Sequence, residues 1–146
     1  MSTGSYGLID APRAVPGWAV LRETRVLGHG RGDFEEAIER FRAGRAHRAA
    51  GIRFHREGED VRMTLLGLNF YCRVAREELS RDEYVFTYVA KQRHPEEGEE
   101  SFVVRIDASE TVTGFVTAIS RPDFAPVRFL QRLAARRYLT GMTPAR

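Results

Sequence analysis

The chain contains a single cysteine, Cys72, and a single lysine, Lys91, among its 146 residues. One cysteine excludes a disulfide within the chain, which agrees with a reducing compartment. No segment has the roughly 20 consecutive apolar residues that a membrane-spanning helix needs. The first residues lack the basic start and the apolar middle of a signal peptide. We therefore expect a cytoplasmic protein that does not associate with a membrane.

Motifs for metals and phosphates are scarce as well. No two histidines are spaced by one helical turn, and Cys72 has no second cysteine to complete a metal site. The glycine-rich segment at residues 28–32 is not followed by the Gly-Lys-Ser/Thr sequence of a phosphate-binding loop. Its glycines also do not have the spacing of a dinucleotide-binding motif. We interpret this segment as a tight turn between a strand and a helix, with contact to a ligand as the alternative. We expect no cofactor and no metal.

The formal net charge is +3, and arginine supplies almost all of the positive charge. Acidic and basic residues alternate along most of the chain, as with Glu36 and Glu39 beside Arg40 and Arg42. Such alternation is typical of a mixed solvated surface, whereas nucleic-acid binders carry a clustered basic face. Nucleic acid is therefore the least favoured class of partner.

The length fits one domain with its own core. Residues 1–16 are rich in glycine, proline and serine and show no periodicity, so we predict a flexible N-terminal arm and a single domain at 17–146. In that domain a strand at 18–27 precedes a helix at 33–43, for which Asp33 is the predicted N-cap. A short helical segment is expected at 45–50.

After Gly51 the hydrophobic pattern changes from helical to alternating. It predicts strands around residues 52–54, 61–65, 72–74, 84–88, 102–106 and 112–119, and then a long helix at 125–139. The connections are short and polar, which indicates hairpins. This order predicts an α+β fold in which a curved antiparallel sheet wraps around a long C-terminal helix, with a short helix after the first strand.

The segment at residues 94–102 has a high concentration of titratable side chains, namely one histidine and four glutamates between two apolar strands. His94 and His47 are acid-base candidates because histidine titrates near neutral pH. Two neighbouring carboxylates repel each other, which raises the pKa of one and prepares a general acid. Glu99 and Glu100 adjoin an apolar strand and are expected to point inward. The alternative is a solvated loop with histidines in structural or surface roles.

Two predicted strands have faces of mixed character. Tyr84, Phe86 and Tyr88 alternate on one strand, and Phe115 alternates with threonines that include Thr117 on another. A face of rings and hydroxyls is typical of a ligand pocket, although cross-strand packing uses the same residues. Both interpretations stay open for these two faces.

Several segments occur in a characteristic order and spacing. They are Leu27-Gly28-x-Gly30, His47-x-x-Ala50-Gly51, Cys72-Arg73-Val74, Phe86-x-Tyr88, His94-Pro95-Glu96-x-Gly98-Glu99-Glu100-x-Phe102, Ser120-Arg121-Pro122 and Arg137-Tyr138-Leu139. Together they resemble the uncharacterised protein family numbered 0548, a domain-of-unknown-function family of bacteria and plants. The chain departs from the family pattern at Gly44, where a tryptophan is expected, and at residues 89–93, where Gly-Thr-Leu-Pro-Gly is expected. Loss of an indole empties a large volume, which would enlarge a pocket or mark a lost activity.

The order of elements also resembles the helix-grip architecture of START-like and polyketide-cyclase-like proteins, in which an apolar small molecule lies between sheet and helix. This resemblance implies that the chain binds an apolar or aromatic small molecule there. Whether it is an enzyme stays open. If it is, we expect cofactor-free acid-base chemistry of the cyclase, dehydratase or isomerase type, as in natural-product biosynthesis. The alternative is a non-catalytic interaction or regulatory module, with a homodimer as one form.

Two sets of candidate site residues follow. The catalytic candidates, expected at the polar mouth of the pocket, are His94, Glu99, Glu100, Tyr88 and Arg121. The ligand-binding candidates are His47, Cys72, Arg73, Phe86, Phe102, Phe115 and Thr117. A nucleophilic role for Cys72 is the less favoured interpretation because no base is located beside it, although the adjacent Arg73 would lower the pKa of the thiol.

Overall fold

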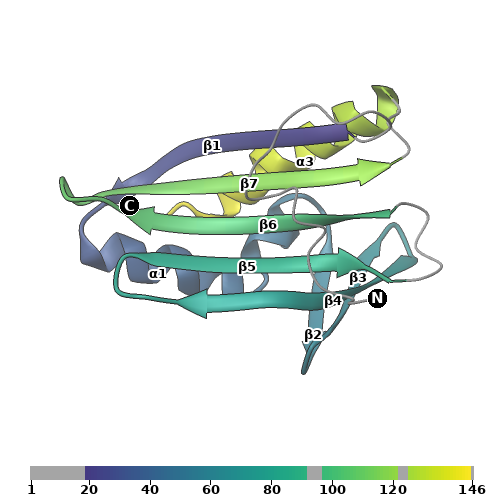
Figure 1. Ribbon diagram of the computed structural model, residues 1–146, viewed down its shortest axis with the longest axis horizontal. Coiled ribbons are helices and arrows are strands. Elements are labelled where there is room, and N and C mark those ends of the chain that lie inside the picture. Colours follow the sequence, from purple (N-terminus) through teal and green to yellow (C-terminus); the bar gives the residue numbers. More distant parts are fainter. Residues whose placement is uncertain (1–18, 92–96, 122–124, 146) are drawn as a thin grey trace.

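A computed structural model describes residues 19–91, 97–121 and 125–145, without the side chains of residues 97, 121 and 125–128 (Figure 1). The predicted arm at residues 1–16 lies outside the described residues. Within them, one antiparallel sheet has the strand order β1-β7-β6-β5-β4-β3-β2. The strands are β1 (Ala19–His29), β2 (Arg53–Glu57), β3 (Asp60–Leu65), β4 (Leu68–Leu79), β5 (Glu83–Ala90), β6 (Glu97–Ile106) and β7 (Thr111–Arg121).

The helices α1 (Arg31–Arg42), α2 (Arg45–Ala49) and α3 (Ala125–Met142) lie on one side of the sheet (Figure 1). α1 and α2 connect β1 at one edge of the sheet with β2 at the other. The long α3 contacts β1, β7, α1 and α2. The predicted α+β fold is therefore confirmed. None of the described helices has the length and apolar character needed to cross a membrane.

The start of α1 differs from the prediction. The helix begins at Arg31, and the N-cap is Gly30, not Asp33. Gly30 has a φ of 93°, which favours glycine, and its N–H donates to the carbonyl oxygen of Glu110 at 2.8 Å. Asp33 lies in the first turn, where its carboxylate accepts a hydrogen bond from the backbone N–H of His29 at 2.9 Å. The hydrogen bond between Gly30 and Glu110 joins two turns that are distant in sequence, so the local pattern did not predict it. The helix therefore begins two residues earlier than predicted.

The core lies between the inner face of the sheet and the helices. Strand alternation turns every second side chain toward the helices. Phe41 of α1 is at the centre of this layer, with its ring centroid 4.8 Å from that of Phe102 and 5.1 Å from that of Phe86. Truncation of such a ring to alanine typically costs about 3–5 kcal/mol of stability. This aromatic layer therefore holds α1 against the strands.

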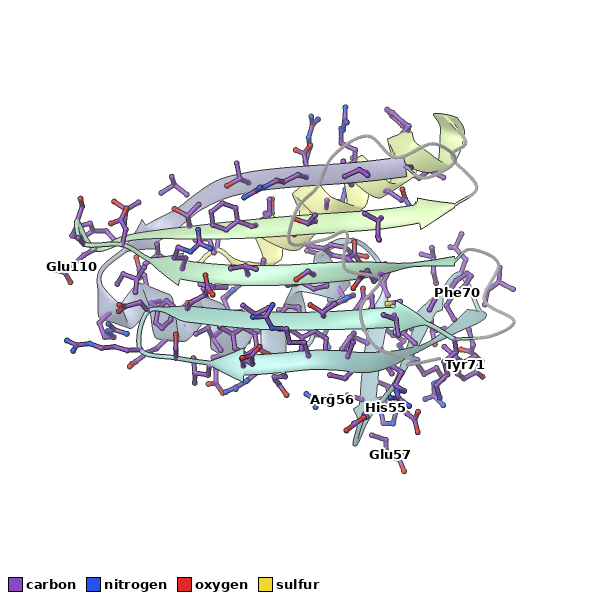
Figure 2. The ribbon with its side chains drawn as sticks, in the orientation of Figure 1. His55, Arg56, Glu57, Phe70, Tyr71 and Glu110 are labelled. Carbon is purple, nitrogen blue, oxygen red and sulfur yellow. The ribbon has the colours of Figure 1, made fainter. Side chains whose placement is uncertain are left out.

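The two ends of the sheet differ in character (Figure 2). Glu110 marks the tight turn between β6 and β7 at one end, and Phe70 and Tyr71 of β4 lie toward the other. At that second end, the hairpin between β3 and β4 exposes Leu66 and Leu68, at 93% and 64% of their surface. This hairpin therefore presents exposed apolar side chains at that end of the sheet.

The crossing of α2 and α3 is close because of Gly141. A Cβ atom at Gly141 would lie 2.5 Å from the carbonyl oxygen of Arg45 and 2.7 Å from the Cα atom of Ala46. The carbonyl oxygen of Gly141 also accepts a hydrogen bond from Arg40 Nε at 2.9 Å. Both neighbours of the missing Cβ are backbone atoms, so they cannot move aside without displacing α2.

We expect Gly141→Ala to destabilise the fold by about 1–3 kcal/mol because the new methyl group overlaps the backbone of α2. For a chain of this length, this corresponds to a fall in Tm of about 2–4 °C per kcal/mol. Gly32→Ala in α1 is the matched control, since nothing lies within 4 Å of its added Cβ. It should leave Tm unchanged or raise it. Equal Tm values for the two variants would contradict the close crossing.

Candidate functional site

A cavity of about 140 Å³ lies between the inner face of the sheet and α3. Its apolar lining includes Met63, Ala90, Ala118, Ile119 and Ala134. Its polar lining includes Cys72, Tyr88, Glu100, Ser120, Gln131 and Tyr138. The alanines of β5, β7 and α3 carry only methyl groups, so the side chains of facing elements do not fill the space between them.

A chain of hydrogen bonds runs from the cavity wall into the core. The hydroxyl of Tyr88 donates to Glu100 Oε1 at 2.6 Å, and the hydroxyl oxygen of Tyr88 also lies 3.1 Å from His47 Nε2. A tyrosine hydroxyl has one proton, and here that proton faces Glu100, so Tyr88 accepts from His47. His47 is consequently the neutral tautomer with its proton on Nε2.

His47 is completely buried among aromatic rings. Its ring centroid lies 4.4 Å from that of Phe54 and 4.8 Å from that of Tyr138. Burial lowers the pKa of His47 from 6.5 to about 3, so the side chain is uncharged at neutral pH. Its Nδ1 atom has no hydrogen-bond partner among the described residues, which a neutral acceptor nitrogen tolerates better than a charged N–H would.

The other titratable groups at the cavity are held in their protonated forms. Burial, with the negative charge of Glu100 as the next cause, raises the pKa of Tyr88 and of Tyr138 well above the ordinary value. Burial and the same carboxylate raise the pKa of the Cys72 thiol to about 12. Cys72 is therefore a thiol and not a thiolate at neutral pH, which argues against a nucleophilic role.

The structure brings four of the predicted site residues together. Tyr88 and Glu100 form the hydrogen-bonded pair in the wall, His47 lies directly behind Tyr88, and Cys72 lines the cavity. Glu99 borders the cavity as well, one position before Glu100 on β6.

Five other predicted residues do not line the cavity. Phe86 and Phe102 are buried in the aromatic layer of the core, and the ring centroid of Phe102 lies 5.3 Å from that of His47. Arg73, Phe115 and Thr117 occupy strand positions that face away from α3.

The outward strand face has its own contacts. The guanidinium groups of Arg22 and Arg105 lie 5.4 Å and 5.0 Å from the ring centroid of Phe115. Arg73 Nε is buried and has no partner among the described residues. His94 and the side chain of Arg121 lie outside the described part of the chain, so their predicted roles stay predictions.

Three cavity residues on α3, namely Gln131, Ala134 and Tyr138, were not among the predicted site residues. The helical spacing of the apolar residues in this segment indicated only a core-facing stripe. Gln131 Nε2 donates to Ser120 Oγ at 2.9 Å and joins α3 to β7 beside the cavity. The sequence feature that could have identified them is the presence of two polar residues, Gln131 and Tyr138, in an otherwise apolar stripe. A helix face that only packs against the core does not require polar residues.

The departure at Gly44 does not enlarge this cavity. Gly44 lies between α1 and α2 with a φ of 80°, and it borders a separate hollow beside Phe54 and Arg53 of β2. A positive φ favours glycine over any larger residue. The replacement of the expected tryptophan therefore affects the turn between the helices, not the described cavity wall.

A further hollow, beside β2 and α1, is lined by Glu77. Glu77 accepts hydrogen bonds from Tyr84 and from Arg56, each at 2.7 Å (Arg56 is labelled in Figure 2). Burial alone would raise the pKa of Glu77, but these hydrogen bonds and the charges of Arg56 and Arg42 outweigh it and lower the pKa. The group is a compensated ion-pair network that joins β2, β4 and α1.

No group of three or more His, Cys, Asp or Glu side chains in the described residues is arranged to hold a metal ion. The polar groups of the cavity are hydroxyls, a thiol, an amide and the carboxylates of Glu99 and Glu100. These groups can donate and accept hydrogen bonds and can transfer a proton without a metal.

Comparisons with known proteins support the fold. A family model described as Domain of unknown function (DUF1990) matches residues 4–141. This match confirms that the chain belongs to a domain-of-unknown-function family, as predicted. The assignment to the family numbered 0548 stays a prediction. No curated protein matches the chain.

Solved structures with the same fold come from distant organisms. A hypothetical protein from Helicobacter pylori has a TM-score of 0.67 at 11% identity, covering 98% of this chain and 95% of that chain. A protein from Mesorhizobium loti has a TM-score of 0.58 at 11% identity, covering 86% and 94%. A major latex-like protein from Panax ginseng has a TM-score of 0.50 at 15% identity, covering 88% and 99%. At these identities the likeness shows the fold alone.

We expect Tyr88→Phe to destabilise the protein by about 1–3 kcal/mol, because it removes the hydrogen bond to Glu100 and leaves the buried His47 N–H unpaired. Tyr71→Phe is the control, since Tyr71 is 50% exposed and should change stability by less than about 0.5 kcal/mol. Urea unfolding of both variants measures the difference. If Tyr88→Phe is as stable as Tyr71→Phe, the hydrogen-bond chain is incorrect.

The lowered pKa of His47 predicts acid sensitivity. Between pH 6.5 and about 3 the unfolded chain binds a proton that the folded chain does not, so stability falls as the pH decreases. The contribution of His47 to this decrease in the free energy of unfolding reaches about 1.4 kcal/mol per pH unit. We expect His47→Gln to lose this part of the slope, while His55→Gln, at an exposed position, keeps it. Tm measured against pH for the three proteins tests this, and identical slopes would refute it.

Proposed function

The chain belongs to the DUF1990 family, whose description assigns no activity, and we propose that it binds a small apolar or aromatic molecule in the cavity between the sheet and α3. The observation that carries this proposal is the Tyr88–Glu100 pair in the wall of an otherwise largely apolar cavity. Ligand sites are typically apolar spaces with a few convergent polar groups.

The size of the cavity limits the ligand. Its volume of about 140 Å³ is close to that of the engineered cavity of about 150 Å³ that binds benzene. A molecule with one ring, or a short branched chain, fits such a space. A larger ligand would need movement of α3 or of the segments outside the described residues.

A catalytic role is the second candidate, and the short hydrogen bond between Tyr88 and Glu100 favours it. Glu100 would act as general base and accept a proton from the ligand, while Tyr88 stabilises the carboxylate. Tyr138, which stays protonated, would donate a hydrogen bond to negative charge that develops on the ligand. This chemistry suits an isomerase, a dehydratase or a cyclase without a cofactor. His94, Glu99 and Arg121 stay predicted contributors.

The non-catalytic alternative has its own support in the exposed apolar hairpin. Leu66, Leu68 and Tyr71 are all at least half exposed. Exposed apolar surface of this kind often marks a contact with another protein. Under this alternative the cavity would be a by-product of packing, and the protein would be isolated as a homodimer or with a partner, and without a small molecule.

The first experiment is native mass spectrometry of the protein from its own host, followed by extraction of any bound molecule. A stoichiometric one-ring compound supports the binding proposal. An empty dimer or a bound protein supports the interaction module.

We expect Ala134→Met to reduce the affinity for a neutral one-ring probe, benzyl alcohol, by about tenfold or more, because the longer side chain fills the cavity. Leu133→Met is the matched control, since Leu133 is on the same helix but 41% exposed and outside the lining. Chemical-shift titration of both variants and the unaltered protein measures the affinities. Equal affinities for the two variants would exclude this cavity as the binding site.

A further inference from the structure

A hollow of about 470 Å³ lies where the turn between α1 and α2 meets the hairpin of β2 and β3. Its lining includes three arginines and one histidine, namely Arg48, Arg53, Arg62 and His55. None of its described lining residues is acidic. Gly44 borders the hollow without a side chain, so the space beside β2 stays open. The volume falls within the range of about 300–1,000 Å³ that is typical of ligand sites.

Cross-strand pairing places the basic side chains of this hairpin on one face. Arg53 pairs with Thr64 and His55 pairs with Arg62, and directly opposite residues of an antiparallel pair share a face. Arg53 and Arg62 are therefore diagonal neighbours, and long side chains at such positions can reach the same point. β2 is an edge strand, and Figure 2 shows His55 at this edge of the molecule. Arg48 of α2 borders the same hollow from the helices.

The three arginines of the hollow form no ion pair with another described residue. By contrast, Arg105 on the outward face of β6 is paired with Glu83 at 2.7 Å. Glu57 lies 3.7 Å from His55 Nε2, but its side chain is 89% exposed and does not line the hollow. Like charges on facing strand positions repel each other, which reduces stability. A hairpin selected for stability and solubility alone would therefore gain from an acidic residue at one of these positions.

An anion with two negative charges would compensate this group of side chains. A phosphate monoester carries about 1.5 to 2 negative charges at neutral pH and has three strong acceptor oxygens. A guanidinium group can donate two parallel hydrogen bonds to such a phosphate, and an imidazole N–H can donate one more. A single carboxylate has one charge and two oxygens, so it would leave more of the positive charge uncompensated. The residues of the hollow therefore fit a phosphate group best.

We propose that this hollow binds a small phosphate monoester, whose phosphate group is held by Arg48, Arg53 and Arg62. The organic part of the ester lies against Ile52 and Phe54, which supply apolar lining. This inference does not depend on the proposed function, because the hollow and the cavity beside α3 have no described lining residue in common. The protein therefore has a second binding site, of opposite chemical character to the first.

Four compounds test the proposal, namely phenyl phosphate, phenyl sulfate, phenol and inorganic phosphate, titrated at neutral pH and moderate salt. Phenyl sulfate has the same shape as phenyl phosphate but only one negative charge. We expect phenyl phosphate to bind about tenfold tighter than phenyl sulfate, and phenol not to bind in the hollow. Inorganic phosphate should bind more weakly than the ester because it lacks the contacts of the ring. Calorimetry gives the affinities, and chemical-shift changes at Gly44 and Thr64 locate the compounds.

Arg53→Gln and Arg62→Gln each remove one charge from the hollow. Each should weaken the binding of phenyl phosphate about fivefold or more, because one guanidinium contact is lost. Both variants should fold as well as the unaltered protein, since they relieve repulsion between like charges. Arg137→Gln is the matched control, because Arg137 is exposed on α3, outside the hollow, and its loss changes the net charge equally. It should leave the affinity within about twofold.

Several results would overturn the inference. Equal affinities for phenyl sulfate and phenyl phosphate would refute the selection of a phosphate, and equal affinities for inorganic phosphate and phenyl phosphate would refute the ester. If Arg137→Gln weakens binding as much as the two variants in the hollow, the effect is one of net charge and the inference fails. A single-stranded oligonucleotide that displaces phenyl phosphate at a lower concentration would make the hollow a nucleic-acid surface instead. Shifts at Cys72 and Tyr138 report on the cavity beside α3 and test the proposed function separately.

Discussion

The hydroxyl group of Tyr88 joins the helices, the sheet and the cavity. Its single oxygen donates to Glu100 and accepts from His47, so it connects α2 with β5 and β6. α2 has only five residues, which is too short for a helix to be stable by itself. The helix depends on this hydrogen bond, on the rings around His47 and on the close contact with Gly141. The position of α3, and with it one wall of the cavity, depends on α2 in turn.

The site combines features that each reduce stability. A cavity forfeits the contacts that a filled core would make, and a carboxylate next to apolar side chains loses hydration. In this fold both features occur at one place, where Glu100 meets the alanines between the sheet and α3. The remainder of the inner face is filled by the rings around Phe41. A dense aromatic layer and a small unfilled space therefore lie side by side on the inner face of the sheet.

Several parts of the site could be predicted because they depend on local pattern. The alternation of Phe86 and Tyr88 indicated one strand face, and the glutamates beside an apolar strand indicated a polar group at its edge. The same alternation could not tell which face was inward, and Phe115 and Thr117, two of the ligand-binding candidates, occupy strand positions that face away from α3. Adjacent residues of a strand point to opposite faces, yet Glu99 and Glu100 both border the cavity. Tyr138 was missed because a tyrosine in an apolar helical stripe is also a normal core residue.

The sequence by itself determined the element types, their order and the antiparallel pairing of neighbouring strands, because these follow from the periodicity of apolar residues and from short turns. Only the tertiary structure decided where the empty space lies and which polar groups meet there. Residues 47, 88, 100 and 138 are far apart in sequence, and the distances among them depend on the crossing of α2 with α3 and on the register of β5 with β6. Those are properties of packing, in which backbone contacts and side-chain volumes from distant segments act together.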